Sequence, residues 1–149
     1  MPFETDEADR MLDNEVFRRY RERRMQELSA KVITISSEKE LIEKTKTMTM
    51  IVHFHKAEFK RCAIMDKMLD EVQGSFPEIA FYRVDADMCP VVAKRLEIRV
   101  LPFLGFFKEG YFVDQVIGFE KLGGDAIDIE CFKKRIAGSN IFRPVSSLQ

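Results

Sequence analysis

The sequence lacks the features of a secreted or membrane-spanning protein. It holds three cysteines, an odd number that does not suit a disulfide framework, and it has neither an apolar leader nor a long apolar run. Its net charge of -1 at pH 7 creates no overall field that would attract nucleic acid or anionic lipid. We therefore expect a protein of the reducing cytoplasm, compatible also with the nucleus, that binds neither nucleic acid nor membrane.

Length and composition limit the chain to one globular domain. The 149 residues suffice for a full hydrophobic core but not for two domains of ordinary size. Hydrophobic residues make up 46% and charged residues 33%, which is typical of a domain with a core and a charged surface. No cysteines and histidines stand at zinc-finger spacing, so we expect no metal site and no cofactor.

Residues 1–29 form a charged segment that we expect to be a long, mostly exposed helix. Acidic residues come first and basic residues later, which is the order that the helix macrodipole favours. The basic block holds five arginines: Arg18, Arg19, Arg21, Arg23 and Arg24. Such a block raises a nucleic-acid interpretation, but these side chains would spread around most of the helix, and Glu22 offsets them. We favour a solvated helix, or one that binds an acidic protein surface, which makes the arginines candidates for protein binding.

The next part of the chain alternates between strands and helices. The β-branched run at 31–36 predicts a short strand. Ser37 and Glu40 form a capping box, which predicts a helix of about ten residues after it. The continuous apolar run at 48–55 predicts a central strand covered on both faces, and a helix over 59–72 follows it.

The second half of the chain continues this alternation. Residues 79–87 predict another strand, and Pro90 suits the first position of a short helix. The apolar segment 100–119 is interrupted by a Lys-Glu-Gly turn, which predicts two antiparallel strands. The period of residues 125–137 predicts a last helix, with Gly138 as its natural end.

This order of elements predicts an α/β domain over residues 30–138. Strands that alternate with helices pair in parallel, and a terminal hairpin makes the sheet mixed, so we expect helices on both of its faces. Residues 139–149 form a tail with too little pattern to assign. The strand–turn–helix near residue 60, followed by Leu101-Pro102 and FLGFFKEG, resembles the thioredoxin fold. In thioredoxins the turn holds Cys-x-x-Cys and a cis-proline loop lies against it, which implies a cis bond at Pro102.

Three longer segments narrow the resemblance to the phosducin-like family. They are VHFHKAEFKRCAIMDK, RLEIRVLPFLGFFKEG and VIGFEKLGGDAIDIECFKKRIAG, and the similarity covers roughly residues 5–138. The KRCxxMD turn and the GFxxLGGxD segment are its more specific parts. The resemblance implies a co-chaperone that binds the eukaryotic cytosolic chaperonin and modulates its folding of actin and tubulin. It implies no disulfide reductase activity.

The turn itself is incomplete as a redox site. Phe59, Lys60, Arg61 and Cys62 occupy the four positions of Cys-x-x-Cys, so a phenyl ring replaces the first cysteine. A dithiol reductase needs an exposed thiolate at the helix N-terminus and a second thiol that resolves the mixed disulfide. Cys62 stands one turn inside the helix, where burial raises the pKa of a thiol, although Lys60 and Arg61 would lower it. We favour an inert Cys62 over a weak monothiol role.

The remaining sulfurs and the histidines have two interpretations each. By the resemblance, His53 stands where reductases of this fold keep a buried acid, and we expect it to satisfy a local hydrogen bond instead of transferring protons. His55 is expected to face solvent. Cys89 would lie at a helix N-terminus, where the dipole lowers a thiol pKa. It is either the most reactive sulfur or, as we prefer, an ordinary residue of the cap, and Cys131 contributes to packing.

Phe59, Lys60, Arg61 and Pro102 make up the candidate protein-binding face. With a cis bond, Pro102 would shape a loop facing Phe59 and complete a docking groove. Phe59 either contacts a partner in place of the attacking thiol or packs on its own domain, and the residues favour neither. The sequence thus predicts a non-catalytic adaptor, and the alternative is a weak thiol oxidoreductase that uses Cys62 or Cys89.

Overall fold

The computed structural model describes residues 19, 32–120, 122 and 128–145. Backbone contacts divide the chain into residues 1–31 and 32–149, and the structure below is that of the second unit. Of the arginine block, only Arg19 is described, and it is exposed. The expected N-terminal helix and the other four arginines lie outside the described residues. No helix in the described part of the chain is long and apolar enough to cross a membrane.

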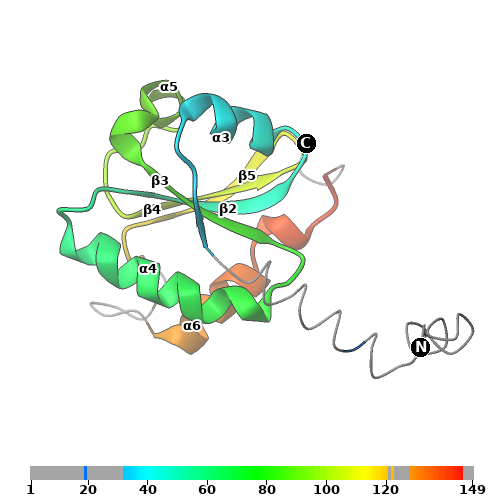
Figure 1. Ribbon diagram of the computed structural model, residues 1–149. Helices are drawn as coiled ribbons and strands as arrows, with labels where there is room; N and C mark the ends of the chain where they lie inside the picture. Colours follow the sequence, from blue (N-terminus) through cyan, green and yellow to red (C-terminus); the bar gives the residue numbers. More distant parts are fainter. Residues whose placement is uncertain (1–18, 20–31, 121, 123–127, 146–149) are drawn as a thin grey trace, which may run out of the picture. The chain divides into compact units, whose positions relative to one another are not determined.

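A mixed sheet of five strands forms the centre of the domain (Figure 1). The strands are β1 (Ile33–Thr34), β2 (Thr49–His55), β3 (Ala80–Asp85), β4 (Phe103–Lys108) and β5 (Tyr111–Ile117). Their order across the sheet is β1-β3-β2-β4-β5. The pairs of β3 with β1 and with β2 are parallel, and the pairs of β4 with β2 and with β5 are antiparallel. This is the predicted arrangement of parallel strands with a terminal hairpin.

Strand β2 is central because its residues are apolar on both sides. Met50, Val52 and Phe54 face one layer of the core, while Ile51 faces the other. Five of its seven residues are buried, as the continuous apolar run predicts. The strand therefore holds the sheet to both helical layers and ends at His55, immediately before the candidate site.

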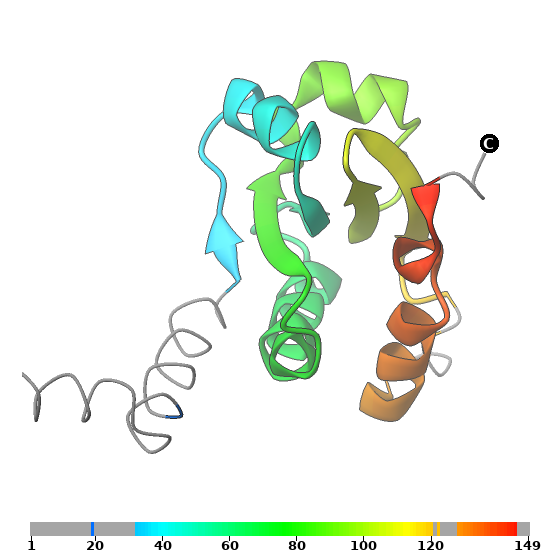
Figure 2. The same ribbon diagram turned by 90° about the vertical axis from the view of Figure 1, so that its right-hand side faces the viewer.

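Two helices cover each face of the sheet (Figures 1 and 2). The helices are α3 (Glu38–Thr45), α4 (Lys60–Val72), α5 (Pro90–Arg95) and α6 (Ile129–Ala137), with single 3-10 turns at Gln73–Ser75, Ala86–Met88 and Asn140–Phe142. Helices α4 and α6 lie together on one face, and α3 and α5 lie together on the other. The connections from β1 to β2 and from β3 to β4 supply α3 and α5, so the helix expected after each strand is present.

The start signals predicted for α3 and α5 are confirmed in part. Ser37 precedes α3, and its hydroxyl accepts a hydrogen bond from the Glu40 amide at 3.1 Å. The other half of the capping box differs from the prediction, because the Glu40 carboxylate accepts from the Ser36 hydroxyl at 3.5 Å. Helix α5 begins with Pro90 in its first turn. For α6 the N-cap is Asp128, whose carboxylate accepts from the Glu130 amide at 2.9 Å.

Several predicted elements are longer than those observed, including β3, which ends at Asp85 and not at residue 87, where a 3-10 turn takes its place. Strand β1 keeps two residues of the expected 31–36, because it lies at the sheet edge and pairs with β3 alone. Helix α6 begins at Ile129, and residues 125–127 of the expected helix are outside the described part. The tail is more structured than its pattern indicates, since the Lys108 ammonium donates to the carbonyls of Ile141 and Arg143 at 3.0 and 2.9 Å.

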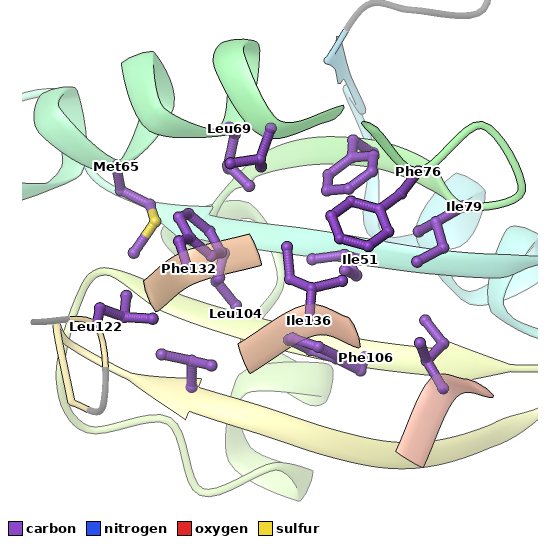
Figure 3. Packing of buried hydrophobic residues seen from close by; sticks show 14 of the residues in the cluster. Ile51, Met65, Leu69, Phe76, Ile79, Leu104, Phe106, Leu122, Phe132 and Ile136 are labelled. Carbon is purple, nitrogen blue, oxygen red and sulfur yellow. The ribbon is translucent and has the colours of Figure 1, made fainter. Parts of the chain in front are cut away.

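The larger core cluster lies between the sheet and helices α4 and α6 (Figure 3). Phe132 of α6 is fully buried there, and Leu104 and Phe106 of β4 face it from the sheet. Met65 and Leu69 reach the same cluster from α4. Burial of each large side chain contributes about 1.5–3 kcal/mol relative to exposure, so this layer fixes both helices on the sheet.

Two phenylalanines near the C-terminus give a matched test of this core. We expect Phe132→Ala to lower the free energy of unfolding by about 3–5 kcal/mol, because it leaves a cavity in a fully packed layer. Phe142 is 42% exposed, so Phe142→Ala should cost less than about 1 kcal/mol. Urea denaturation followed by circular dichroism measures both. Equal losses for the two variants would contradict the packing described.

Candidate functional site

The predicted turn joins β2 to α4 and presents Phe59 to solvent. Phe59 is the N-cap residue of α4, with an extended backbone and no side-chain cap. A phenyl ring cannot accept hydrogen bonds from the free amides of the first turn, and the ring is 43% exposed. Its carbonyl accepts from the amides of Cys62 and Ala63 at 3.1 and 3.3 Å, which begins the helix. The ring that replaces the first cysteine is therefore a surface group.

The proline loop lies at the same end of the sheet. The Leu101-Pro102 bond is cis, as the resemblance implied. Pro102 is buried, and its carbonyl accepts a hydrogen bond from the Gly118 amide at 2.8 Å. Gly118 has a φ of 59°, a left-handed conformation that favours glycine. Pro102 thus supports the surface from beneath and offers little surface itself.

A chain of contacts connects helix α4 to this loop. The guanidinium of Arg61 lies 5.1 Å from the ring centroid of Phe119, a cation–π distance. Phe119 follows Gly118, whose amide is bonded to the Pro102 carbonyl and whose backbone lies near Val100. Val100 is itself 50% exposed. We call the exposed residues Phe59, Lys60, Arg61 and Val100, together with the buried Phe119 and Pro102, the cis-proline face.

Cys62 is buried behind this face. Its side chain is 2% exposed, and it is reduced. Burial raises the pKa of the Cys62 thiol above its ordinary value, the negative charges of Asp66 and Glu58 raise it further, and a hydrogen bond with the Lys56 backbone opposes them. The expected lowering by Lys60 and Arg61 is absent. An accessible thiolate is therefore disfavoured at this position.

Cys89 has no activation either, which corrects the interpretation of it as the most reactive sulfur. It is the N-cap residue of α5, as we preferred, but it is fully buried, and burial raises the pKa of its thiol to about 11. The Glu38 carboxylate accepts from the amides of Val91 and Val92 at 2.9 and 3.0 Å. A carboxylate therefore occupies the positive end of the helix and adds to the pKa increase. Cys131 is half-buried on α6.

His53 satisfies a local hydrogen bond, as expected. Its side chain is fully buried, and Nδ1 lies 2.8 Å from Oδ1 of Asp66 on α4. Burial lowers the pKa of His53, and the bond to Asp66 offsets part of that effect. Burial would raise the pKa of Asp66, but the hydrogen bond and charge of His53 outweigh it and lower that pKa. His55, expected to face solvent, is half-buried, with its ring 5.3 Å from that of His53.

Arg83 completes the charged cluster behind the turn, and the sequence did not reveal this cluster. Arg83 lies opposite His53 in the β2–β3 pair, with Nε 3.7 Å from Asp66 Oδ1 and Nη2 3.5 Å from Asp70 Oδ1. Asp66 follows Cys62 by four residues, so both face the sheet from one side of α4. The four-residue spacing of Cys62 and Asp66 was the sequence signal that could have indicated part of this cluster. Among the described residues, no group of three or more histidine, cysteine or acidic side chains is placed to hold a metal ion.

The His53–Asp66 pair predicts a loss of stability in mild acid. In the folded protein the pKa of His53 lies below its ordinary 6.5, so between that lowered pKa and pH 6.5 the protein takes up a proton when it unfolds. The free energy of unfolding that His53 contributes is complete above pH 6.5. It is lost as the pH falls toward the folded pKa, at up to about 1.4 kcal/mol per pH unit. His53→Gln should flatten this acid slope below pH 6.5, because it removes the titrating group.

Urea midpoints measured across this pH range test the assignment. The comparison with the wild type uses the pH slope, because the substitution can also shift absolute stability. Asp66 contributes in a separate range, since its lowered pKa places its own loss below its ordinary 3.8. An unchanged acid slope in His53→Gln would show that another group carries the dependence.

Comparison with known proteins agrees with this geometry. The thioredoxin family model matches residues 30–124. Phosducin-like protein 3 of Dictyostelium discoideum is 37% identical over 102 residues, which cover 68% of this chain and 55% of that protein. Phosducin-like protein 1 of Saccharomyces cerevisiae is 29% identical over 156 residues, which cover 91% of this chain and 68% of that protein. The chain belongs to the thioredoxin family, in its phosducin-like branch.

Further comparisons show what share of the related proteins this chain covers. Human thioredoxin domain-containing protein 9 is 31% identical over 109 residues, covering 72% of this chain and 48% of that protein. The chain thus spans about half the length of that relative and of the Dictyostelium protein. Malassezia sympodialis thioredoxin, at 23% identity and a TM-score of 0.60, covers 72% of this chain and 89% of its own. At that identity the likeness establishes the thioredoxin fold alone.

Proposed function

We propose that this phosducin-like chain is a non-catalytic adaptor that binds the eukaryotic cytosolic chaperonin and modulates the folding of actin and tubulin. The supporting observation is the state of the turn that thioredoxins use for redox chemistry. Its first position carries the exposed Phe59, and its one sulfur, Cys62, is buried with a raised pKa. The same scaffold therefore offers a contact surface where a reductase would offer an attacking thiolate. Membership in the phosducin-like branch supports the same class of function.

The cis-proline face has the composition of a protein contact. An exposed aromatic ring beside basic residues is the kind of anchor that contributes most binding energy at interfaces, since aromatic and arginine side chains dominate such sites. Lys60 is exposed, and Arg61 is held against Phe119 by the cation–π contact. An anchor held in this way loses less side-chain entropy when a partner binds. The face therefore suits a partner with an apolar group flanked by acidic residues.

Residues 1–29 supply a second contact in this proposal. The arginine block of that segment suits an acidic surface of the chaperonin. Two weak contacts on one chain act together, because binding of the first raises the effective concentration of the second. Deletion of residues 1–29 should therefore weaken binding without removing the contribution of Phe59. We place this activity in the cytoplasm and the nucleus, where the reduced cysteines are stable.

The proposed contact can be tested with a matched pair of exposed apolar residues on one helix. Phe59 is 43% and Ile64 is 38% exposed. We expect Phe59→Ser to weaken recovery of chaperonin subunits from a eukaryotic lysate by about tenfold, equivalent to about 1.4 kcal/mol. Ile64→Ser should leave recovery near that of the wild type. Binding is measured by immobilising each variant and titrating the lysate.

Three results would count against the adaptor. If chaperonin is absent from the wild-type eluate, it is not the partner. If both serine variants recover equal amounts of chaperonin, the cis-proline face is not the contact surface. The third result is that both serine variants bind as well as the wild type at low salt and that all three lose binding at raised salt. It would indicate a purely electrostatic contact through residues 1–29. Circular dichroism of each variant serves as the folding control.

A further inference from the structure

The sheet has one long edge, and that edge is closed by side chains. Edge strands carry free amides and carbonyls that can pair with a strand of another molecule. Strand β1 at one edge has two residues, whereas β5 at the other has seven. On β5, the carbonyl of Val113 and the amides and carbonyls of Gln115 and Ile117 bond to groups outside β4.

Two side chains from beyond the sheet occupy the outer carbonyls of β5. Nδ2 of Asn140 donates to the carbonyl of Val113 at 3.0 Å. Nη2 of Arg135, on α6, donates to the carbonyl of Gln115 at 2.9 Å. A strand from another molecule would need these same acceptors, because antiparallel pairs exchange both amide and carbonyl bonds between opposite residues.

Carboxylates occupy the outer amides in the same way. The Gln115 amide donates to Oδ1 of the neighbouring Asp114 at 2.8 Å, and the Ile117 amide donates to Oε1 of Glu120 at 3.2 Å. The Ile117 carbonyl also accepts from the Glu120 amide at 3.2 Å. At Gln115 and Ile117 both the outer amide and the outer carbonyl are therefore already bonded within the chain, and at Val113 the outer carbonyl is.

Asp114 locks the two covering side chains in place. Its carboxylate accepts two hydrogen bonds from Arg135, at 3.2 and 2.7 Å, and another from the backbone amide of Asn140 at 3.1 Å. Asp114 and Arg135 are each 18% exposed, so water competes little for this paired geometry. The guanidinium also lies 5.7 Å from the Phe106 ring centroid. This is a constructed cover and not a loose surface contact.

We propose that Arg135 and Asn140 form an edge seal that keeps β5 from pairing with β5 of a second copy of this chain. Two β5 strands run antiparallel about a twofold axis at Gln115, so each copy offers the other the same donors and acceptors. With the seal in place, β5 does not pair with a second copy, and partners of the chain bind away from this edge.

The double variant Arg135→Ala/Asn140→Ala tests the seal on the full chain. Analytical ultracentrifugation at concentrations on the order of 100 µM should show the wild type at 17.4 kDa and the double variant approaching twice that mass. Lys134→Ala is the matched control, because Lys134 is exposed on the same turn of α6 and its substitution removes the same charge. It should remain monomeric. A folded double variant that stays monomeric at this concentration overturns the seal.

A third substitution identifies the surface that associates. Gln115→Pro removes the outer amide at the centre of β5, so adding it to the double variant should restore the monomer. A dimer that persists in the triple variant would mean association elsewhere, and it would contradict the proposal. If the double variant fails to fold by circular dichroism, Arg135→Lys/Asn140→Ser, which keeps the charge beside Asp114, faces the same criteria: dimer formation supports the seal, and a folded monomer overturns it.

Discussion

The packing of helix α4 against strand β2 is the constraint on which the rest of the site depends. It places Cys62 and Asp66 on the buried side of the helix and leaves Phe59 exposed at its start. The hydrogen bond between His53 and Asp66 joins the two elements through buried and part-buried side chains. One helix orientation thus makes the sulfur inaccessible and the aromatic ring available.

Charge placement around the sulfurs works in the same direction as burial. Asp66 and Glu58 act on Cys62, and Glu38 and Asp85 act on Cys89, so acidic side chains disfavour both thiolates. In each case burial is the largest cause. A reductase would require the reverse arrangement, with a positive environment at an exposed thiol. The basic residues of the turn, Lys60 and Arg61, are exposed on the cis-proline face.

Local patterns predicted the fold well, because the signals for helix starts and strands lie within a few residues. The capping role of Ser37, the central position of 48–55 and the hairpin at 100–119 follow from such signals. The candidate site was only partly predictable. Glu38 meets Val91 across 53 residues, and Asp114 meets Arg135 across 21. Such contacts depend on tertiary packing, so no local spacing reveals them; the spacing of Cys62 and Asp66 indicated at most a shared face.

We propose that an aromatic ring in place of the attacking sulfur makes this scaffold a binding surface without thiol chemistry. Insulin reduction in the presence of dithiothreitol tests it most directly, because a dithiol site accelerates precipitation of the freed insulin chains. We predict that the purified chain gives the same rate as buffer. A rate comparable to that of a dithiol thioredoxin at equal concentration would contradict the account.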